Sequence, residues 1–204
     1  MQIMSARVID GVKIGQQIRE EVRQEVAELK KAGIVPGLAA VLVGHNPASQ
    51  VYVRNKIKAC ENLGIYSESL QLPETATTQE LLDRLSVLNL RQEVDGILVQ
   101  LPLPKQVDET AVLCAVDPAK DVDGLHPVNA GNLALGRAGL RPCTPSGVVE
   151  ILRRENTPLK GRHAIIDRLA LKRALRLRRP RGHLPGQSVH RFGGAGACLP
   201  TGDG

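Results

Sequence analysis

Apolar residues recur at helical spacing along the first part of the chain and then form short continuous runs. Between Asp10 and Ala32 they return every three to four positions among charged residues, which predicts an amphipathic helix. Residues 38–44 are an apolar run, LAAVLVG, typical of a strand buried on both faces of a sheet. Residues 48–63 again show helical spacing. Helix and buried strand therefore alternate from the start.

The same alternation continues to residue 166. We expect a strand over 65–72, a helix over 78–90, a strand over 95–100, a short helix over 107–115, a polar loop over 117–132, a helix over 145–154 and a strand over 161–166. The expected N-caps are Thr77 or Thr78, with Glu80 in the first turn, and Thr144. This order predicts an α/β fold, a three-layer αβα domain with a mostly parallel sheet.

The charge of the chain is concentrated at one end. The 204 residues have a formal net charge of +6. Residues 1–166 carry 19 basic and 19 acidic side chains, whereas residues 167–204 carry 8 and 2. The last segment is rich in Arg, Gly and Pro and lacks the alternation, so we expect an aberrant, disordered tail. Nucleic-acid binding through this Arg-rich tail is the alternative interpretation.

Cysteine spacing and hydropathy limit the classes of protein. Cys60, Cys114, Cys143 and Cys198 are too far apart for a metal knuckle or a dense disulfide framework, so we expect reduced, individually buried cysteines and no metal. The sequence contains no run of about 18 apolar residues, so it predicts no membrane span. The first residues lack the apolar stretch of a signal peptide. We therefore expect a cytoplasmic protein without a membrane partner.

Tyr52 and Lys56 are the first candidates for chemistry. Their i, i+4 spacing puts both side chains on one face of the predicted helix. A lysine in an apolar cleft can act as acid or base near neutral pH, although such a pair is also common on surface helices. Short-chain dehydrogenases carry the same pair, but they need a Gly-rich turn after the first strand, where this chain has only Gly44. Gln100 ends the third predicted strand, at the edge where open α/β sheets bind ligands.

Four motifs in order carry a more specific signal. They are NPASQVYVRNKIKACENLGI, VDGILVQLPLP, DVDGLHPVNAGNLALG and PCTPSGVVEIL. Together they closely resemble the bifunctional methylenetetrahydrofolate dehydrogenase/methenyltetrahydrofolate cyclohydrolase family, FolD in bacteria. The resemblance covers residues 5–166. It implies a folate-binding catalytic domain over residues 5–142, followed by a linking helix and the first strand of an incomplete Rossmann-like NADP-binding domain over residues 143–166.

The resemblance implies a role for each matched residue. Lys56 corresponds to the catalytic acid/base of the cyclohydrolase step, and Gln100 to the glutamine that hydrogen-bonds it. Tyr52 corresponds to the ring that stacks on the folate. Asp123 corresponds to the pterin ligand, and a carboxylate suits this role because it accepts two hydrogen bonds from the ring N–H and the exocyclic amine.

Three further polar or pocket positions have structural alternatives. Ser49 matches a serine near the lysine and Pro102 a residue that shapes the pocket, both at the substrate. Ser49 can equally be a cap at the helix start, and Pro102 a strand terminator. Asp121 is expected to organise its loop rather than to bind a ligand.

The implied reactions are oxidation of 5,10-methylenetetrahydrofolate to the methenyl cation with NADP and hydrolysis of that cation to 10-formyltetrahydrofolate. After Ile166 the NADP motif of the family is absent, and Asp167, Arg168 and Leu169 follow. We therefore expect a truncation or frameshift near residue 167 and a loss of dehydrogenase activity. Expected partners are tetrahydrofolate derivatives and a second copy in a homodimer, not nucleic acid. An inactive folate-binding remnant is the alternative.

Overall fold

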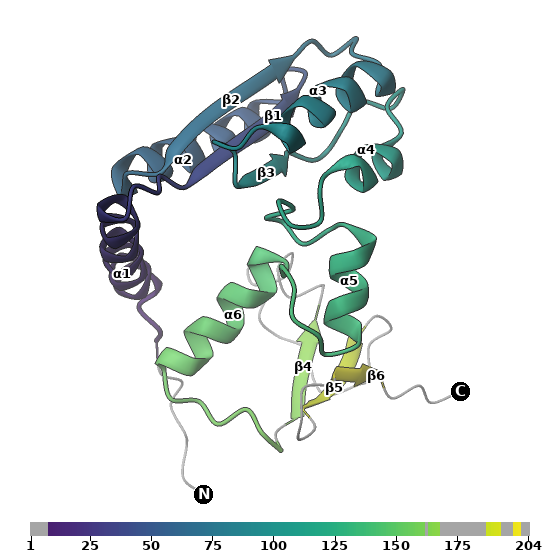
Figure 1. The fold of residues 1–204 in the computed structure, drawn as a ribbon. Helices are drawn as coiled ribbons and strands as arrows, with labels where there is room; N and C mark the ends of the chain where they lie inside the picture. Colours follow the sequence, from purple (N-terminus) through teal and green to yellow (C-terminus); the bar gives the residue numbers. More distant parts are fainter. Residues whose placement is uncertain (1–7, 162, 168–186, 193–197, 201–204) are drawn as a thin grey trace, which may run out of the picture.

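The computed structural model describes residues 8–161, 163–167, 187–192 and 198–200. Its elements in chain order are α1 (Gly11–Lys31), β1 (Gly37–Val43), α2 (Pro47–Leu63), β2 (Tyr66–Leu72), α3 (Thr78–Leu90), β3 (Gly96–Val99), α4 (Glu109–Ala115), α5 (Pro127–Ala134), α6 (Cys143–Arg154), β4 (His163–Asp167), β5 (Gln187–Phe192) and β6 (Cys198–Pro200). Figure 1 shows α2 and α3 on either side of the β1–β3 sheet. The predicted α/β fold is confirmed.

A three-stranded parallel sheet of order β2-β1-β3 forms the centre of the first part of the chain. The middle strand, β1, is almost fully buried, which explains its unbroken apolar sequence. One apolar cluster joins the sheet to α3 and α4 through residues such as Val41, Leu85 and Ile97. A smaller cluster on the other face includes Leu42 and Val53. Apolar side chains are therefore buried on both faces of the sheet, between the sheet and the helices that cover it.

The predicted helix ends are mostly confirmed. Thr77 and Glu80 form a capping box at the start of α3, with each residue satisfying the other's backbone N–H. The expected cap at Thr144 is wrong. Helix α6 begins at Cys143 after Pro142 and has no side-chain cap, so Thr144 lies inside its first turn. Pro145 is tolerated in the first turn of α6, because backbone N–H groups in the first turn of a helix have no intrahelical acceptor.

The polar segment that we expected to be a loop contains a helix. α5 begins at Pro127, directly after its N-cap His126. The ring nitrogen Nδ1 of His126 accepts a hydrogen bond of 3.1 Å from the backbone N–H of Val128. Proline at the first helical position and a capping side chain favour the start of a helix here. The Gly and Asn residues in the segment interrupt the apolar spacing by which sequence analysis recognises a helix.

The strand expected over 161–166 is present as β4, but its partners differ from those of a parallel dinucleotide domain. β4 pairs antiparallel with β5, and β5 pairs antiparallel with β6. The basic tail over 167–204 was expected to be disordered, yet the structure places two short strands in it. The remaining tail residues lie outside the described part of the chain.

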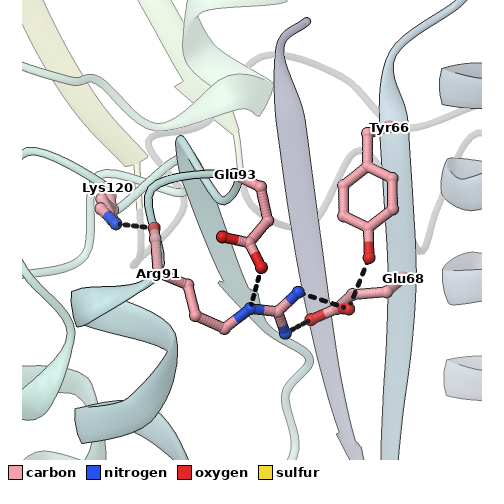
Figure 2. A network of polar contacts seen from close by, with 5 residues as sticks. All are labelled: Tyr66, Glu68, Arg91, Glu93 and Lys120. Carbon is pink, nitrogen blue, oxygen red and sulfur yellow. Dashed lines mark hydrogen bonds and ion pairs between the residues drawn. The ribbon is translucent and has the colours of Figure 1, made fainter.

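A cluster of charged side chains ties edge strand β2 to the turn between α3 and β3 (Figure 2). Arg91 makes two hydrogen bonds to the carboxylate of Glu68, at 2.6 and 3.1 Å, and a third to Glu93 at 2.8 Å. The hydroxyl of Tyr66 donates to Glu68, and Lys120 donates to the backbone carbonyl of Arg91. Tyr66 is the first residue of β2, so this cluster lies at the amino edge of the parallel sheet.

None of the helices in the described ranges combines the length and the apolar composition that crossing a bilayer requires.

Candidate active site

Lys56 and Gln100 meet at the carboxyl edge of the sheet. The Nζ amine of Lys56 donates a hydrogen bond of 3.3 Å to Oε1 of Gln100. The amide of Gln100 donates in turn to the carbonyl of Leu101 at 2.7 Å, which leaves Oε1 directed to the lysine. The backbone N–H of Gln100 donates a hydrogen bond to the backbone carbonyl of Val41 in β1, so Gln100 continues the hydrogen bonding of the sheet beyond β3. Both side chains are half-buried.

Helix α2 presents Tyr52 and Lys56 on one face. The side chain of Asn46 caps this helix by accepting a hydrogen bond of 3.1 Å from the backbone N–H of Ser49, and Pro47 occupies the first helical position. Ser49 itself is buried and is not the cap, so the capping alternative for Ser49 is wrong. Tyr52 is 62% exposed, which leaves its ring face free to contact a flat ligand.

The loop that carries Asp123 is organised by a buried carboxylate. Asp121 is 6% exposed, and its Oδ2 accepts hydrogen bonds of 2.8 Å from the backbone N–H of His126 and 3.0 Å from the side-chain amide of Asn129. Asp121 also forms a parallel bridge with Ile97 of β3. This agrees with the loop-organising role expected for Asp121. Asp121 therefore anchors the loop beside β3, the strand that precedes Gln100.

Asp123 and Cys143 share an electrostatic environment with Lys56. Burial raises the pKa of the Asp123 carboxyl, the positive charge of Lys56 lowers it, and the negative charge of Asp121 raises it further. Burial likewise raises the pKa of the Cys143 thiol, and the charges of Asp123 and Lys56 act on it with opposite signs. The thiol donates to the carbonyl of Val122 at 3.4 Å. The structure therefore brings the start of α6 to the same place as Asp123 and Lys56.

Sequence analysis did not predict Cys143 or Asn129 at this site. We expected individually buried cysteines, but Cys114 and Cys143 are exposed and Cys60 is half-buried, each as a free thiol. Asn129 is 4% exposed, although it lies in a segment that we expected to be a polar loop. Only the folded arrangement of the loop and α6 reveals both positions.

Pro102 lies two residues after Gln100. It is exposed, and the Leu101–Pro102 peptide bond is cis. Among the described residues, no group of three or more His, Cys, Asp and Glu side chains has a geometry that could hold a metal ion. The candidate side chains described above are one amine, one amide, one carboxylate and an exposed aromatic ring.

The sequence profile of the tetrahydrofolate dehydrogenase/cyclohydrolase catalytic domain matches residues 9–123. The chain belongs to this family. Among its curated relatives, the bifunctional protein FolD of Koribacter versatilis is 59% identical over 163 residues, which are 80% of this chain and 53% of the relative. FolD of Dehalococcoides mccartyi strain CBDB1 is 55% identical over 164 residues, with 80% of this chain and 55% of the relative covered.

Solved structures of the tetrahydrofolate dehydrogenase/cyclohydrolase family have the same fold. The bifunctional enzyme FolD from Campylobacter jejuni is 46% identical with a TM-score of 0.73, covering 74% of this chain and 54% of that one. The Trypanosoma brucei enzyme, solved with NADP cofactor and inhibitor, is 39% identical with a TM-score of 0.73, covering 76% of this chain and 54% of that one. The chain thus spans about half the length of the relatives that it matches.

Proposed function

We propose that this chain hydrolyses 5,10-methenyltetrahydrofolate to 10-formyltetrahydrofolate, the cyclohydrolase half of the activity named for its relatives. The hydrogen bond between Lys56 and Gln100 carries this proposal, because it holds an amine at the carboxyl edge of a parallel sheet. Family membership and the identity to FolD proteins support it. Because the chain spans about half of these relatives, their whole activity is not transferred to it.

Lys56 is the proposed acid and base of the reaction. Water adds to the cationic methenyl carbon, and Nζ of Lys56 in its neutral form accepts the proton that this water loses. The hydroxyl group now on that carbon loses its remaining proton to solvent and becomes the formyl C=O as the C–N bond of the five-membered ring breaks. Lys56 returns the first proton to the departing nitrogen. A cationic substrate beside the lysine favours its neutral form, which the first step requires. Gln100 keeps the amine in place by accepting its hydrogen bond.

Asp123 and Tyr52 are proposed to orient the substrate. The carboxylate of Asp123 would accept hydrogen bonds from the pterin ring N–H and exocyclic amine, and the exposed ring of Tyr52 would stack on the flat part of the folate. Ser49, buried in the first turn of α2, is proposed to act at the substrate site near Lys56. Pro102 shapes the wall after Gln100.

The residues after β4 do not fit NADP. Dinucleotide domains hold the phosphates at the carboxyl end of a parallel strand, on the N–H groups of a Gly-rich turn and helix N-terminus. Here β4 pairs antiparallel with β5, and the sequence after Ile166 continues with Asp167, Arg168 and Leu169. We therefore propose that this chain has no NADP-dependent dehydrogenase activity, and we derive no step through the cofactor.

The domain bounds, the oligomeric state and the localisation of the chain are also proposals. We propose a folate-binding domain over residues 5–142, a linking segment over residues 143–166 and an aberrant tail over residues 167–204. We also propose a homodimer in the cytoplasm, supported by the family resemblance and by the free thiols. Light scattering of the full chain measures the dimer.

Hydrolysis of methenyltetrahydrofolate by the full chain tests the proposed function. The wild-type chain should accelerate the loss of methenyl absorbance. Lys56→Gln should abolish turnover, because glutamine neither accepts nor returns the proton, while calorimetry should still detect folate binding. Lys31→Gln, an exposed lysine of α1 paired with Glu28, is the matched control and should turn over at the wild-type rate.

Two outcomes would contradict the proposal. Equal turnover in wild type and Lys56→Gln would remove the role of Lys56. Folate binding without turnover in the wild-type chain would make it an inactive folate-binding protein, the alternative that the sequence left open.

A further inference from the structure

The imidazole ring of His126 joins the ends of two helices. Its Nδ1 accepts a hydrogen bond of 3.1 Å from the backbone N–H of Val128, in the first turn of α5. Its Nε2 lies 3.2 Å from the backbone carbonyl of Cys114, in the last turn of α4. The first N–H groups and the last carbonyls of a helix have no partner within that helix. One ring therefore satisfies a donor of α5 and an acceptor of α4.

These two partners define where the ring of His126 carries its hydrogen. A backbone N–H can only donate, so Nδ1 must present its lone pair to Val128. A carbonyl oxygen can only accept, so Nε2 must carry the hydrogen that faces Cys114. Neither the other tautomer nor the protonated ring makes both bonds, because each places a hydrogen on Nδ1. The arrangement therefore requires the neutral Nε2–H imidazole.

The two helices that His126 joins differ in how firmly they are packed. Val112 of α4 is fully buried in the apolar cluster that connects this helix to α3 and the sheet. In α5, Asn129 is the one buried residue. Figure 1 shows α4 close to α3, with α5 at the other end of the connecting loop. The contact from His126 to Cys114 therefore ties a sparsely packed helix to the core.

Asp123 lies in the short loop that ends at His126. Asp121 holds the first end of this loop beside Ile97 of β3, and its Oδ2 accepts the backbone N–H of His126 at 2.8 Å. The ring of His126 holds the other end of the loop to α4. Because Asp123 lies between these two anchors, the position of its carboxyl depends on both.

We propose that His126 is a positioning residue for substrate binding, whose Nε2–H imidazole holds the Asp123 loop at the site by joining α4 to α5. This inference rests on the proposed function, because it assumes that Asp123 binds the flat ring system of the folate. Among the described residues, His126 makes no hydrogen bond to Lys56 or Gln100, whose own contact lies between α2 and the end of β3. Loss of the imidazole should therefore weaken substrate binding and leave the proton transfer by Lys56 intact.

Steady-state methenyl hydrolysis and calorimetric folate binding by the full chain test this role. His126→Asn keeps a capping oxygen for α5, but its shorter side chain cannot also reach the Cys114 carbonyl. We expect KM and the folate dissociation constant to rise about fivefold, as for the loss of one typical hydrogen bond, with kcat unchanged. A merely structural role predicts a different result, because a smaller folded fraction lowers the apparent kcat and leaves KM unchanged.

Asp10→Ala is the matched control for the loss of a helix-end contact. The exposed side chain of Asp10 caps α1 by accepting a hydrogen bond of 3.0 Å from the backbone N–H of Lys13. Removing this cap should lower the urea midpoint of unfolding, because the first turn of α1 loses a partner. KM and folate affinity should stay at the wild-type values.

A double variant tests whether His126 acts through Asp123. Asp123→Ala alone should weaken folate binding, and adding His126→Asn should weaken it no further, because the residue that His126 positions is gone. Wild-type KM and affinity in His126→Asn, or additive losses in the double variant, would overturn the inference while hydrolysis by the wild type stands. Folate binding without turnover in the wild type would overturn the proposed function alone, and the affinities of the same variants would still decide the role of His126. Failure of the wild type to bind folate would overturn both.

Discussion

The amine of Lys56 donates a hydrogen bond of 3.3 Å to the side-chain oxygen of Gln100, which is 44 residues further along the chain. Lys56 belongs to the third turn of α2, and Gln100 follows the last residue of β3. A parallel sheet brings them together because β3 ends, and α2 begins, at the same edge of the sheet, and Lys56 lies near the middle of this helix. The second hydrogen bond of Gln100, to the carbonyl of Leu101, defines which of its atoms faces the lysine.

Gln100→Glu tests whether this contact sets the protonation of the lysine. A carboxylate in place of the amide would attract the ammonium form of Lys56, which has no free electron pair to accept a proton from water. Methenyl hydrolysis at neutral pH should fall by about 100-fold or more, the contribution of general acid–base catalysis. The rate should recover as the pH rises, because alkali returns the neutral amine.

The pH profile separates this effect from a structural one. Gln100→Asn, which is shorter but uncharged, should lower the rate without moving the profile. A Gln100→Glu profile that coincides with that of the wild type would contradict the proposed proton transfer.

Much of this arrangement could be predicted from sequence. The helical spacing before Ala32 and the apolar run of β1 each correspond to an element found within two residues of its expected ends. Local rules sufficed there, because burial on both faces and caps such as Thr77 leave their own pattern in the sequence. The Tyr52 and Lys56 pair was visible for the same reason, since i, i+4 spacing is a property of one helix.

The positions that sequence analysis missed depend on contacts between distant segments. α5 starts inside a segment rich in Gly and Asn, and its start depends on the cap formed by His126. Asn129 is buried because it donates to Asp121 and to the carbonyl of Pro118, contacts that no periodicity encodes. Cys143 faces Asp123 only because α6 begins beside that loop. The antiparallel pairing of β4 with β5 likewise could not be predicted from a local sequence pattern.

The pH dependence of folate binding should report on Asp123. Burial raises the pKa of its carboxyl above the ordinary value, so the group takes up a proton at a higher pH than an exposed aspartate. Binding that needs the carboxylate should weaken as the pH falls through this raised pKa. Lys56→Gln removes a positive charge that lowers this pKa and should move the weakening to higher pH. Asp121→Asn removes a negative charge that raises it and should move the weakening to lower pH.

The unliganded protein should show the opposite sign. Its folded state holds the Asp123 proton more tightly than the unfolded chain does, so the contribution to stability is complete below the unfolded pKa. That contribution is lost as the pH rises through the folded pKa. Calorimetric titrations of folate at a series of pH values, together with urea unfolding, check both signs. Shifts of the binding curve in the same direction for Lys56→Gln and Asp121→Asn would rule out this electrostatic account.

Gly124 is required by the loop that carries Asp123. Its backbone φ of +63° lies in the left-handed region, and a Cβ built there would lie 2.7 Å from backbone atoms of Arg141 and Pro142. Gly124→Ala should therefore cost at least about 1–2 kcal/mol of unfolding free energy, the penalty for that backbone region alone. Folate binding should weaken as well, because the overlap pushes the loop away from the residues that precede α6.

Gly131 provides the matched control for this substitution. It lies in α5, and a Cβ there would meet no atom within 4 Å. Gly131→Ala should stabilise the chain by about 0.4–1 kcal/mol, because alanine restricts the unfolded chain and suits a helix. Urea unfolding of both variants measures the two free energies, and calorimetry measures folate affinity. If the two alanine variants had the same stability, the left-handed turn at Gly124 would not be what fixes the Asp123 loop against the chain before α6.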